Sequence, residues 1–360
     1  METKFLKFAS RCLTHYYIKK MDRYFNTNLS KPATVMIYVT HACNSRCKFC
    51  TLNGKRNPNE LGTEEWKKIL FDLKEWLGYY YLNLMGGEPF LRKDLFEIAN
   101  FASENGAIVD ITTNGFLINK KIVKKIAASG ISKIIFSLDG MNPETHDWLR
   151  QPGFFDKVMS AINELKNENI NITLNTVINK CNMDQLEDLV MFTHRNNLNG
   201  IRFIELQDIE LMTQEMKRKV LPNDKKKIKA VMGNLILLKK NGYPIMNSVK
   251  NLELIKMYFL NISSGFKGIF CDLPFDQLCI DAFGNVLPCY KANKFFTESL
   301  GNLLSKKPED VWNSETYVKS RKLRSKCMKR CMLGDGYVSN DGIFSNAKRF
   351  YMGFRKNIGS

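Results

Sequence analysis

Short apolar segments and longer amphipathic segments alternate along the middle of the chain. The apolar segments are rich in branched and aromatic residues, and the amphipathic ones repeat their apolar residues at helical spacing. This alternation is typical of βα units that build a parallel sheet. The pattern predicts strands at Val35–Val39, Tyr80–Leu84, Ile108–Thr112, Lys133–Leu138, Asn171–Val177 and Ile201–Leu206. It predicts helices at Leu95–Glu104, Lys120–Ser129, Phe155–Asn167 and Met183–Asn196.

A further helix is expected to begin at Thr63. Thr63 is a suitable N-cap, and Glu64 and Glu65 place carboxylates in the first turn, where the helix dipole favours them. The apolar stripe of this helix is formed by Trp66, Ile69, Leu70, Leu73 and Trp76.

Six strands with crossover helices favour a partial, open (β/α)6 barrel over a closed barrel of eight strands. In such folds the chemistry lies at the carboxyl ends of the strands. The chain has 360 residues, which exceeds one ordinary domain, so a smaller second domain is expected as well.

The formal net charge of +18 favours an acidic partner such as a membrane surface or a phosphorylated substrate. Lysine-rich stretches such as 217–229 are equally typical of a solvated helix face. No RNA-binding signature is present, so no nucleic-acid partner is expected. The ten cysteines lie in a chain without a secretory signal, and we therefore expect reduced thiols and a cytoplasmic location.

Three cysteines follow the first predicted strand at C-x3-C-x2-C spacing: Cys43, Cys47 and Cys50. Three thiolates leave one position of a four-coordinate site open, whereas a structural zinc site normally uses four protein ligands. A cubic iron–sulfur cluster fits three cysteine ligands, because the protein then ligates three irons and leaves the fourth without a protein ligand. A zinc site or a redox role for these cysteines is the alternative.

The cysteine spacing, with Phe49 before the third cysteine, resembles the radical S-adenosylmethionine (SAM) enzymes. In that family the open iron chelates the methionine end of SAM. The sequence Gly86-Gly87-Glu88-Pro89 after the second strand resembles the family's GGEP motif, which meets the amino group of SAM. Alone, this motif and the polar ends of the third and fourth strands are ordinary strand-to-helix turns.

The resemblance implies a role for residues at several strand ends. Phe49 and Leu206 are expected near the adenine, and Arg150 against the SAM carboxylate. His146 is expected to be structural or surface-exposed. The SAM-binding set implied by the family is Phe49, Gly86, Gly87, Glu88, Asn114, Ser137, Asp139, Arg150, Asn175 and Leu206, with Asn114, Ser137, Asp139 and Asn175 near the ribose and carboxylate.

A second group of cysteines lies downstream, around a predicted β-hairpin with its turn at 281–285. The group resembles the auxiliary-cluster domains called SPASM and, in a shorter form, twitch. That resemblance implies one auxiliary [4Fe-4S] cluster ligated by Cys271, Cys289, Cys327 and Cys331. Cys279 occupies a strand position that is usually apolar, and its role as a ligand stays open. A zinc ribbon is the alternative for the group.

These observations predict an α/β protein with a small C-terminal α+β domain of a hairpin plus helices. The expected divisions are a basic amphipathic helix at 1–30, the radical SAM core at 31–210, a helical connector at 211–268, the auxiliary domain at 269–340 and a basic aromatic tail at 341–360. The two basic ends are compatible with loose contact to an anionic membrane surface. Packing of both ends against the barrel is the competing interpretation.

The resemblance implies reductive cleavage of SAM to a 5′-deoxyadenosyl radical, with an electron from a flavodoxin- or ferredoxin-like donor. The radical would take a hydrogen atom from the substrate, and the auxiliary cluster would accept an electron. We expect an oxidoreductase acting on a small anionic or lipid-linked metabolite. The alternatives are a SPASM-type maturase with a peptide substrate and a non-catalytic iron–sulfur or zinc protein. Only 42 residues precede Cys43, too few for the winged-helix leader-binding domain that such maturases often carry, which counts against a self-sufficient maturase; a separate partner could still provide leader binding.

Overall fold

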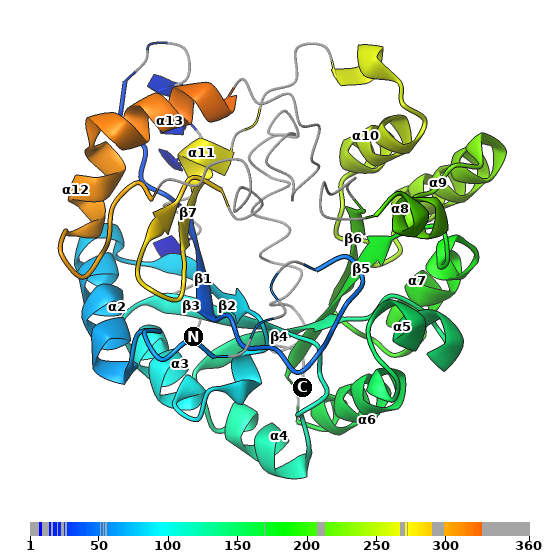
Figure 1. Ribbon diagram of the computed structural model, residues 1–360, viewed down its shortest axis with the longest axis horizontal. Helices are drawn as coiled ribbons and strands as arrows, with labels where there is room; N and C mark the ends of the chain where they lie inside the picture. The colour runs from blue at the N-terminus through cyan, green and yellow to red at the C-terminus, as the bar shows by residue number, and fades with distance from the viewer. Residues whose placement is uncertain are drawn as a thin grey trace.

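A curved sheet of eight strands forms the centre of the protein in a computed structural model (Figure 1). The structure describes residues 7–8, 14–15, 17–19, 21–22, 25, 27–50, 52, 54, 56–168, 170–206, 213–266, 271, 273–289 and 299–325. The spatial order of the strands is β6-β5-β4-β3-β2-β1-β7-β8. Their bounds are β1 (Thr34–Thr40), β2 (Tyr80–Gly86), β3 (Ala107–Thr113), β4 (Ile131–Ser137), β5 (Asn171–Ile178), β6 (Gly200–Glu205), β7 (Gln277–Ile280) and β8 (Val286–Leu287).

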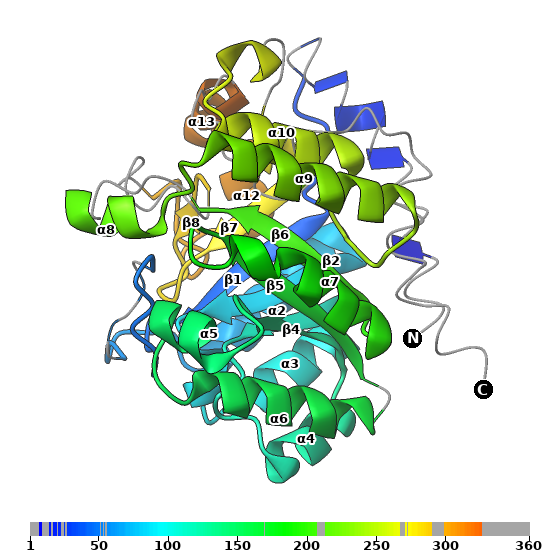
Figure 2. The same ribbon diagram turned by 90° about the vertical axis from the view of Figure 1, so that its right-hand side faces the viewer.

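Helices form an outer ring around this sheet (Figures 1 and 2). The α-helices are α2 (Thr63–Leu77), α3 (Leu95–Glu104), α4 (Lys120–Ala127), α5 (Pro143–Leu149), α6 (Phe154–Lys166), α7 (Leu186–Arg195), α8 (Gln214–Val220), α9 (Lys225–Lys240), α10 (Val249–Phe259), α11 (Leu273–Asp276), α12 (Pro308–Asn313) and α13 (Glu315–Ser325). Short 3-10 turns are η1 (Pro89–Leu91), η2 (Met183–Gln185) and η3 (Ser263–Phe266).

The six strands β1 to β6 are parallel and the sheet does not close, which confirms the predicted partial barrel. The second domain adds to this sheet. β7 pairs in parallel with β1, with Met36 opposite Cys279, and β8 returns antiparallel to β7 as the predicted hairpin. The sequence did not indicate that the hairpin extends the core sheet, because strand pairing between distant segments leaves no local pattern.

Residues alternate between the two faces of the sheet. Outward side chains such as Val35, Ile37 and Val39 are fully buried in the core beneath the helices. Inward side chains form a row across the strands, in which Met36 neighbours Asn83, Asn83 neighbours Asp110, and Asp110 neighbours Lys133. Several inward residues are only partly buried, so solvent reaches the inner face.

Two helix predictions need correction. Gly62, not Thr63, is the N-cap of α2, because the Thr63 hydroxyl donates to Asp94 Oδ2 at 2.8 Å. Helix α5 was not predicted as a helix, although Asn142 followed by Pro143 is a recognisable start signal: the Asn142 side chain accepts from the backbone N–H of Thr145.

Some of the described residues of the N-terminal segment pack against the body of the protein, and others are exposed. Phe8 and His15 are buried, and His15 Nε2 lies 2.7 Å from Asp276 Oδ1. Tyr17 and Phe25 are exposed. Within the described ranges, no helix has the length and apolar character needed to cross a membrane.

Candidate functional site

The loop after β1 carries Cys43, Cys47 and Cys50 at the mouth of the barrel. Cys43 and Cys47 are half-buried and Cys50 is exposed. Across the part of the chain that the structure describes, no three His, Cys, Asp or Glu side chains are arranged to hold a metal ion. The structure thus brings the three cysteines to one loop without closing them into a ligand set.

The surroundings of the sulfurs nevertheless fit an iron–sulfur cluster. The backbone N–H of Ser45 donates to Cys43 Sγ at 3.4 Å, and the Ser45 hydroxyl lies 3.1 Å from Cys47 Sγ. The Arg150 guanidinium lies 3.6 Å from the same sulfur of Cys47. Hydrogen-bond donors and a cation beside thiolates stabilise an anionic cluster and tune its potential. Asn44 Nδ2, a buried atom on the same loop, has no hydrogen-bond partner among the residues that the structure describes.

The glycine pair at the end of β2 lies directly against the start of the cysteine loop. Gly87 donates its N–H to Thr40 O at 2.8 Å, and Glu88 donates its N–H to Ala42 O at 2.7 Å. Gly86 has φ of 131°, and a Cβ on it would lie 2.3 Å from Thr40 O. These positions therefore require glycine so that two backbone segments can meet.

Glu88 is fully buried and joins β2 to the end of β3. Its carboxylate accepts the hydroxyl of Thr113 at 2.7 Å, the N–H of Asn114 at 2.8 Å and the N–H of Phe90 at 3.2 Å. Burial raises the pKa of Glu88 from its ordinary 4.5 to about 7, although these hydrogen bonds favour the charged form. The side chain predicted to meet SAM is thus engaged with the protein.

Glu88 gives a testable pH dependence of stability. Because its pKa is higher in the folded protein, its contribution is fully present below about pH 4.5 and is lost as the pH rises to about 7. Relative to Glu88→Gln, the parent is expected to lose about 3 kcal/mol of unfolding free energy over this interval. Urea unfolding of the apoprotein at several pH values measures the difference, with exposed Glu104→Gln as the control. Parallel pH profiles of parent and Glu88→Gln would contradict the prediction.

Asp139 and Arg150, both predicted to bind SAM, form a buried ion pair. Arg150 Nε donates to Asp139 Oδ2 at 2.7 Å, and Asp139 Oδ1 accepts the N–H of Val177 at 2.8 Å. Although burial opposes its charge, Asp139 and the cysteine sulfurs raise the pKa of Arg150, so the guanidinium stays charged. Through Arg150, the end of α5 is tied to β4 and to the cysteine loop.

His146 supports the Asp139 end of this ion pair. It is fully buried, and its Nδ1 accepts the N–H of Asp139 at 3.1 Å. Burial lowers the pKa of His146 to about 4, so the ring is neutral at physiological pH. Of the two expectations for this residue, the structural one agrees with its burial.

The remaining predicted SAM residues are brought together at the same end of the sheet. Ser137 and Asn175 are neighbours in register on β4 and β5. Asn114 Nδ2 donates to Asn44 Oδ1 at 2.8 Å, which links the end of β3 to the cysteine loop. Phe49 packs on a small apolar cluster that contains Leu206.

The downstream cysteines are described only in part. Cys271 and Cys279 are buried and Cys289 is half-buried. Cys327 and Cys331 lie outside the described residues. Cys279 shares the inner face of the sheet with Met36, so its side chain belongs to the barrel interior and not to the core beneath the helices.

Tyr38, which interacts electrostatically with cysteines of both groups, was not selected from the sequence. It is buried on β1, on the inner face. Burial, followed by the charges of Cys279, Cys289 and Cys50, raises its pKa well above the ordinary range. The only available signal was strand alternation, which separates Tyr38 from the outward Ile37 and Val39.

Comparison with known proteins gives two family matches. Residues 37–193 match the model of the radical SAM superfamily, and residues 271–332 match that of SPASM, an iron–sulfur cluster-binding domain. The chain is 33% identical to mycofactocin maturase MftC of Mycolicibacterium smegmatis, over 49% of this chain and 46% of that protein. It is 35% identical to Fe-coproporphyrin III synthase of Methanosarcina barkeri, over 49% of this chain and 44% of that protein. The matched segment thus spans about half of each relative.

Among solved structures, the fold resembles Streptococcus suis SuiB bound to the precursor peptide SuiA. The TM-score is 0.66 at 20% sequence identity, and the match covers 87% of this chain and 72% of SuiB. At this identity the comparison establishes the shared fold.

Proposed function

Because this chain is an enzyme of the radical SAM superfamily with a SPASM domain after its core, we propose that it is a maturase that modifies a peptide substrate. SAM and [4Fe-4S] clusters are the cofactors of such an enzyme. The likeness in fold to SuiB, which is bound to a precursor peptide in that structure, carries the proposal, since the match covers 87% of this chain. The relative MftC is named as a maturase, which supports the same conclusion.

The comparisons support this alternative better than our expectation of a small anionic or lipid-linked metabolite. Fe-coproporphyrin III synthase is the relative that favours a small molecule. The flavodoxin- or ferredoxin-like electron donor and the membrane contact stay predictions, as does transfer of an electron to an auxiliary cluster.

The chain's own residues divide into two cluster sites and a SAM site. We assign Cys43, Cys47 and Cys50 to the first cluster, and Cys271, Cys289, Cys327 and Cys331 to the second. Bound at these residues, the first cluster and SAM would supply the radical chemistry for hydrogen abstraction from the substrate. Arg150 holds a positive charge 3.6 Å from Cys47 Sγ, and Asp139 fixes its orientation. Phe49 and Leu206 provide an apolar wall that excludes water from the adenine.

The inner face of the sheet carries polar side chains suited to binding the substrate. Lys133 Nζ lies 2.5 Å from Asp110 Oδ2, and the Tyr81 hydroxyl donates to the same carboxylate. Arg202 and Asn175 are neighbours in register on the same face and are partly exposed. A peptide carries amide, carboxylate and ammonium groups that such a surface can bind by hydrogen bonds and ion pairs.

A protease-sensitivity experiment tests the substrate class. Reconstituted, reduced enzyme is incubated with SAM and a boiled, low-mass extract of its own host cells, and 5′-deoxyadenosine is measured. We expect the extract to stimulate SAM cleavage, and we expect the stimulation to be lost when the extract is first digested with proteinase K and the protease is inactivated. An undigested extract given the same inactivated protease is the control. Stimulation that survives digestion, or no stimulation by any extract, would overturn the peptide assignment.

A further inference from the structure

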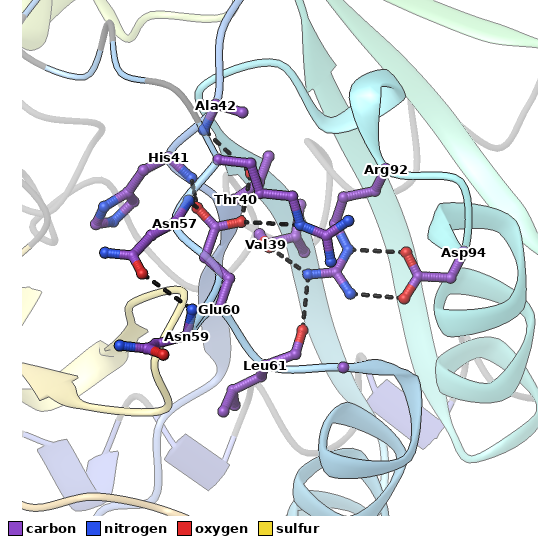
Figure 3. Close-up of polar contacts among 12 residues, drawn as sticks. Val39, Thr40, His41, Ala42, Asn57, Asn59, Glu60, Leu61, Arg92 and Asp94 are labelled. Carbon is purple, nitrogen blue, oxygen red and sulfur yellow. Dashed lines mark hydrogen bonds and ion pairs between the residues drawn. The ribbon is translucent and has the colours of Figure 1, made fainter.

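A buried carboxylate lies at the base of the cysteine loop, which we define as residues 41–60. Glu60 is 6% exposed, and it accepts the Thr40 hydroxyl at 2.7 Å and the backbone N–H of His41 at 2.9 Å. It also accepts the backbone N–H of Asn57 at 3.4 Å. Figure 3 shows Glu60 between these segments. One side chain therefore joins the beginning of the loop to its end.

A buried guanidinium, that of Arg92, makes a second connection between the two ends of the loop. Arg92 is 3% exposed, and its Nη1 donates to Val39 O at 2.8 Å and to Leu61 O at 2.9 Å. Its Nε and Nη2 donate to the two oxygens of Asp94 at 3.0 and 2.6 Å, as the paired dashed lines in Figure 3 show. The planar fork of arginine matches this set of acceptors, which lysine cannot satisfy together.

The turn between β7 and β8 contacts the same two ends of the loop. Leu61 donates its backbone N–H to Ala282 O at 2.9 Å. The His41 ring meets the Phe283 ring edge to face, with centroids 5.3 Å apart. The SPASM domain thus touches the loop at the residues that Glu60 and Arg92 hold.

We propose that Glu60 and Arg92 form a loop clamp, a pair of positioning residues that hold the two ends of the cysteine loop together and so set the geometry of the first cluster. The β7–β8 turn supports this clamp from the second domain. The inference rests on the proposed assignment of Cys43, Cys47 and Cys50 as ligands of that cluster.

The clamp acts on the cluster through the backbone. The loop's own groups, such as the N–H of Ser45, donate to the cysteine sulfurs. If the loop ends move apart, these N–H···S hydrogen bonds lengthen. Such bonds stabilise the more negative, reduced cluster, so weakening them lowers the reduction potential, and the loosened loop holds the irons less firmly. The expected effect is therefore specific to the first cluster.

The test uses reconstituted holoenzyme with Glu60→Gln and Arg92→Lys. Glu64→Gln and Lys93→Met are the matched controls, because both residues are exposed neighbours of the same charge type. Release of iron to a ferrous chelator, the electron paramagnetic resonance (EPR) spectrum of the reduced first cluster, and its midpoint potential are measured, with the second cluster as the internal reference. We expect several-fold faster iron release from the first cluster, an altered spectrum and a lower potential, while the second cluster and both controls match the parent.

Milder and more distant variants keep the test decisive if Glu60→Gln does not fold. Thr40→Val removes one donor to Glu60 and should produce the same change to a smaller degree. Phe283→Ala lies in the second domain but should also speed iron release from the first cluster. Parent-like release, spectrum and potential in all folded variants would overturn the clamp, as would equal loss of both clusters. Failure of the underlying assignment is distinguishable, because Cys43/Cys47/Cys50→Ala would then leave the first-cluster spectrum intact.

Discussion

A variant in which Cys43, Cys47 and Cys50 are all alanine is expected to form no 5′-deoxyadenosine. After anaerobic reconstitution the parent should hold about eight irons and the variant about four, because each cubic cluster holds four irons and only the first is removed. Without it no electron reaches SAM, so the loss should be complete. Iron and sulfide analysis and a deoxyadenosine assay on reduced protein measure both effects.

The controls for this experiment lie on the same chain. Cys181 is an exposed thiol whose Sγ donates to Lys219 O at 3.6 Å, and Cys181→Ala should match the parent. The variant Cys271/Cys289/Cys327/Cys331→Ala should also fall to about four irons but retain SAM cleavage. SAM cleavage by the first triple variant would refute the assignment of its cysteines. A parent with about four irons, unaffected by the downstream substitutions, would show that the second site holds zinc or no metal.

Gly87→Ala is expected to destabilise the protein severely and to abolish SAM binding. A Cβ at this position would lie 2.0 Å from Ala42 O and 2.5 Å from Ala42 C. Both are backbone atoms at the start of the cysteine loop, so no side-chain rotation relieves the overlap. We expect a loss of about 3 kcal/mol or more in unfolding free energy, with displacement of the loop. Urea unfolding and SAM titration by calorimetry measure the two effects.

Gly233→Ala is the matched control for this substitution. Gly233 lies inside α9, and an added Cβ meets no atom within 4 Å. Because glycine is a poor helix former, this alanine is expected to add up to about 1 kcal/mol of stability. Parent-like stability and SAM affinity in Gly87→Ala would mean that the two backbone segments are not in obligatory contact.

Elements whose stability is local were predictable from the sequence. Helix α3 has the predicted bounds, and all six core strands were located to within about two residues at either end. The predicted helix near 183–196 was less accurate, because its first turn is the 3-10 segment η2. Each of these elements has a periodic apolar face that the fold buries, and this periodicity is visible in a single segment.

Features that depend on partners distant in sequence were not predictable. Glu60 and Arg92 look like ordinary loop charges, and only the fold brings them to the same backbone segments. The GGEP motif indicates Glu88, but it does not reveal that Thr113 and Asn114 at the end of β3 donate to its carboxylate. In each case the sequence indicates the residue type, whereas the hydrogen-bond partner comes from another strand.

The pairing of β7 with β1 has a consequence for biosynthesis. β1 ends at Thr40 and its neighbour β7 begins only at Gln277, in the SPASM domain, so the whole stretch between them must be made before that side of β1 is covered. Until then the nascent protein presents an unpaired strand edge, which is a template for association with other chains. The enzyme should therefore depend on chaperones during synthesis, and premature termination before residue 277 should yield an aggregation-prone product.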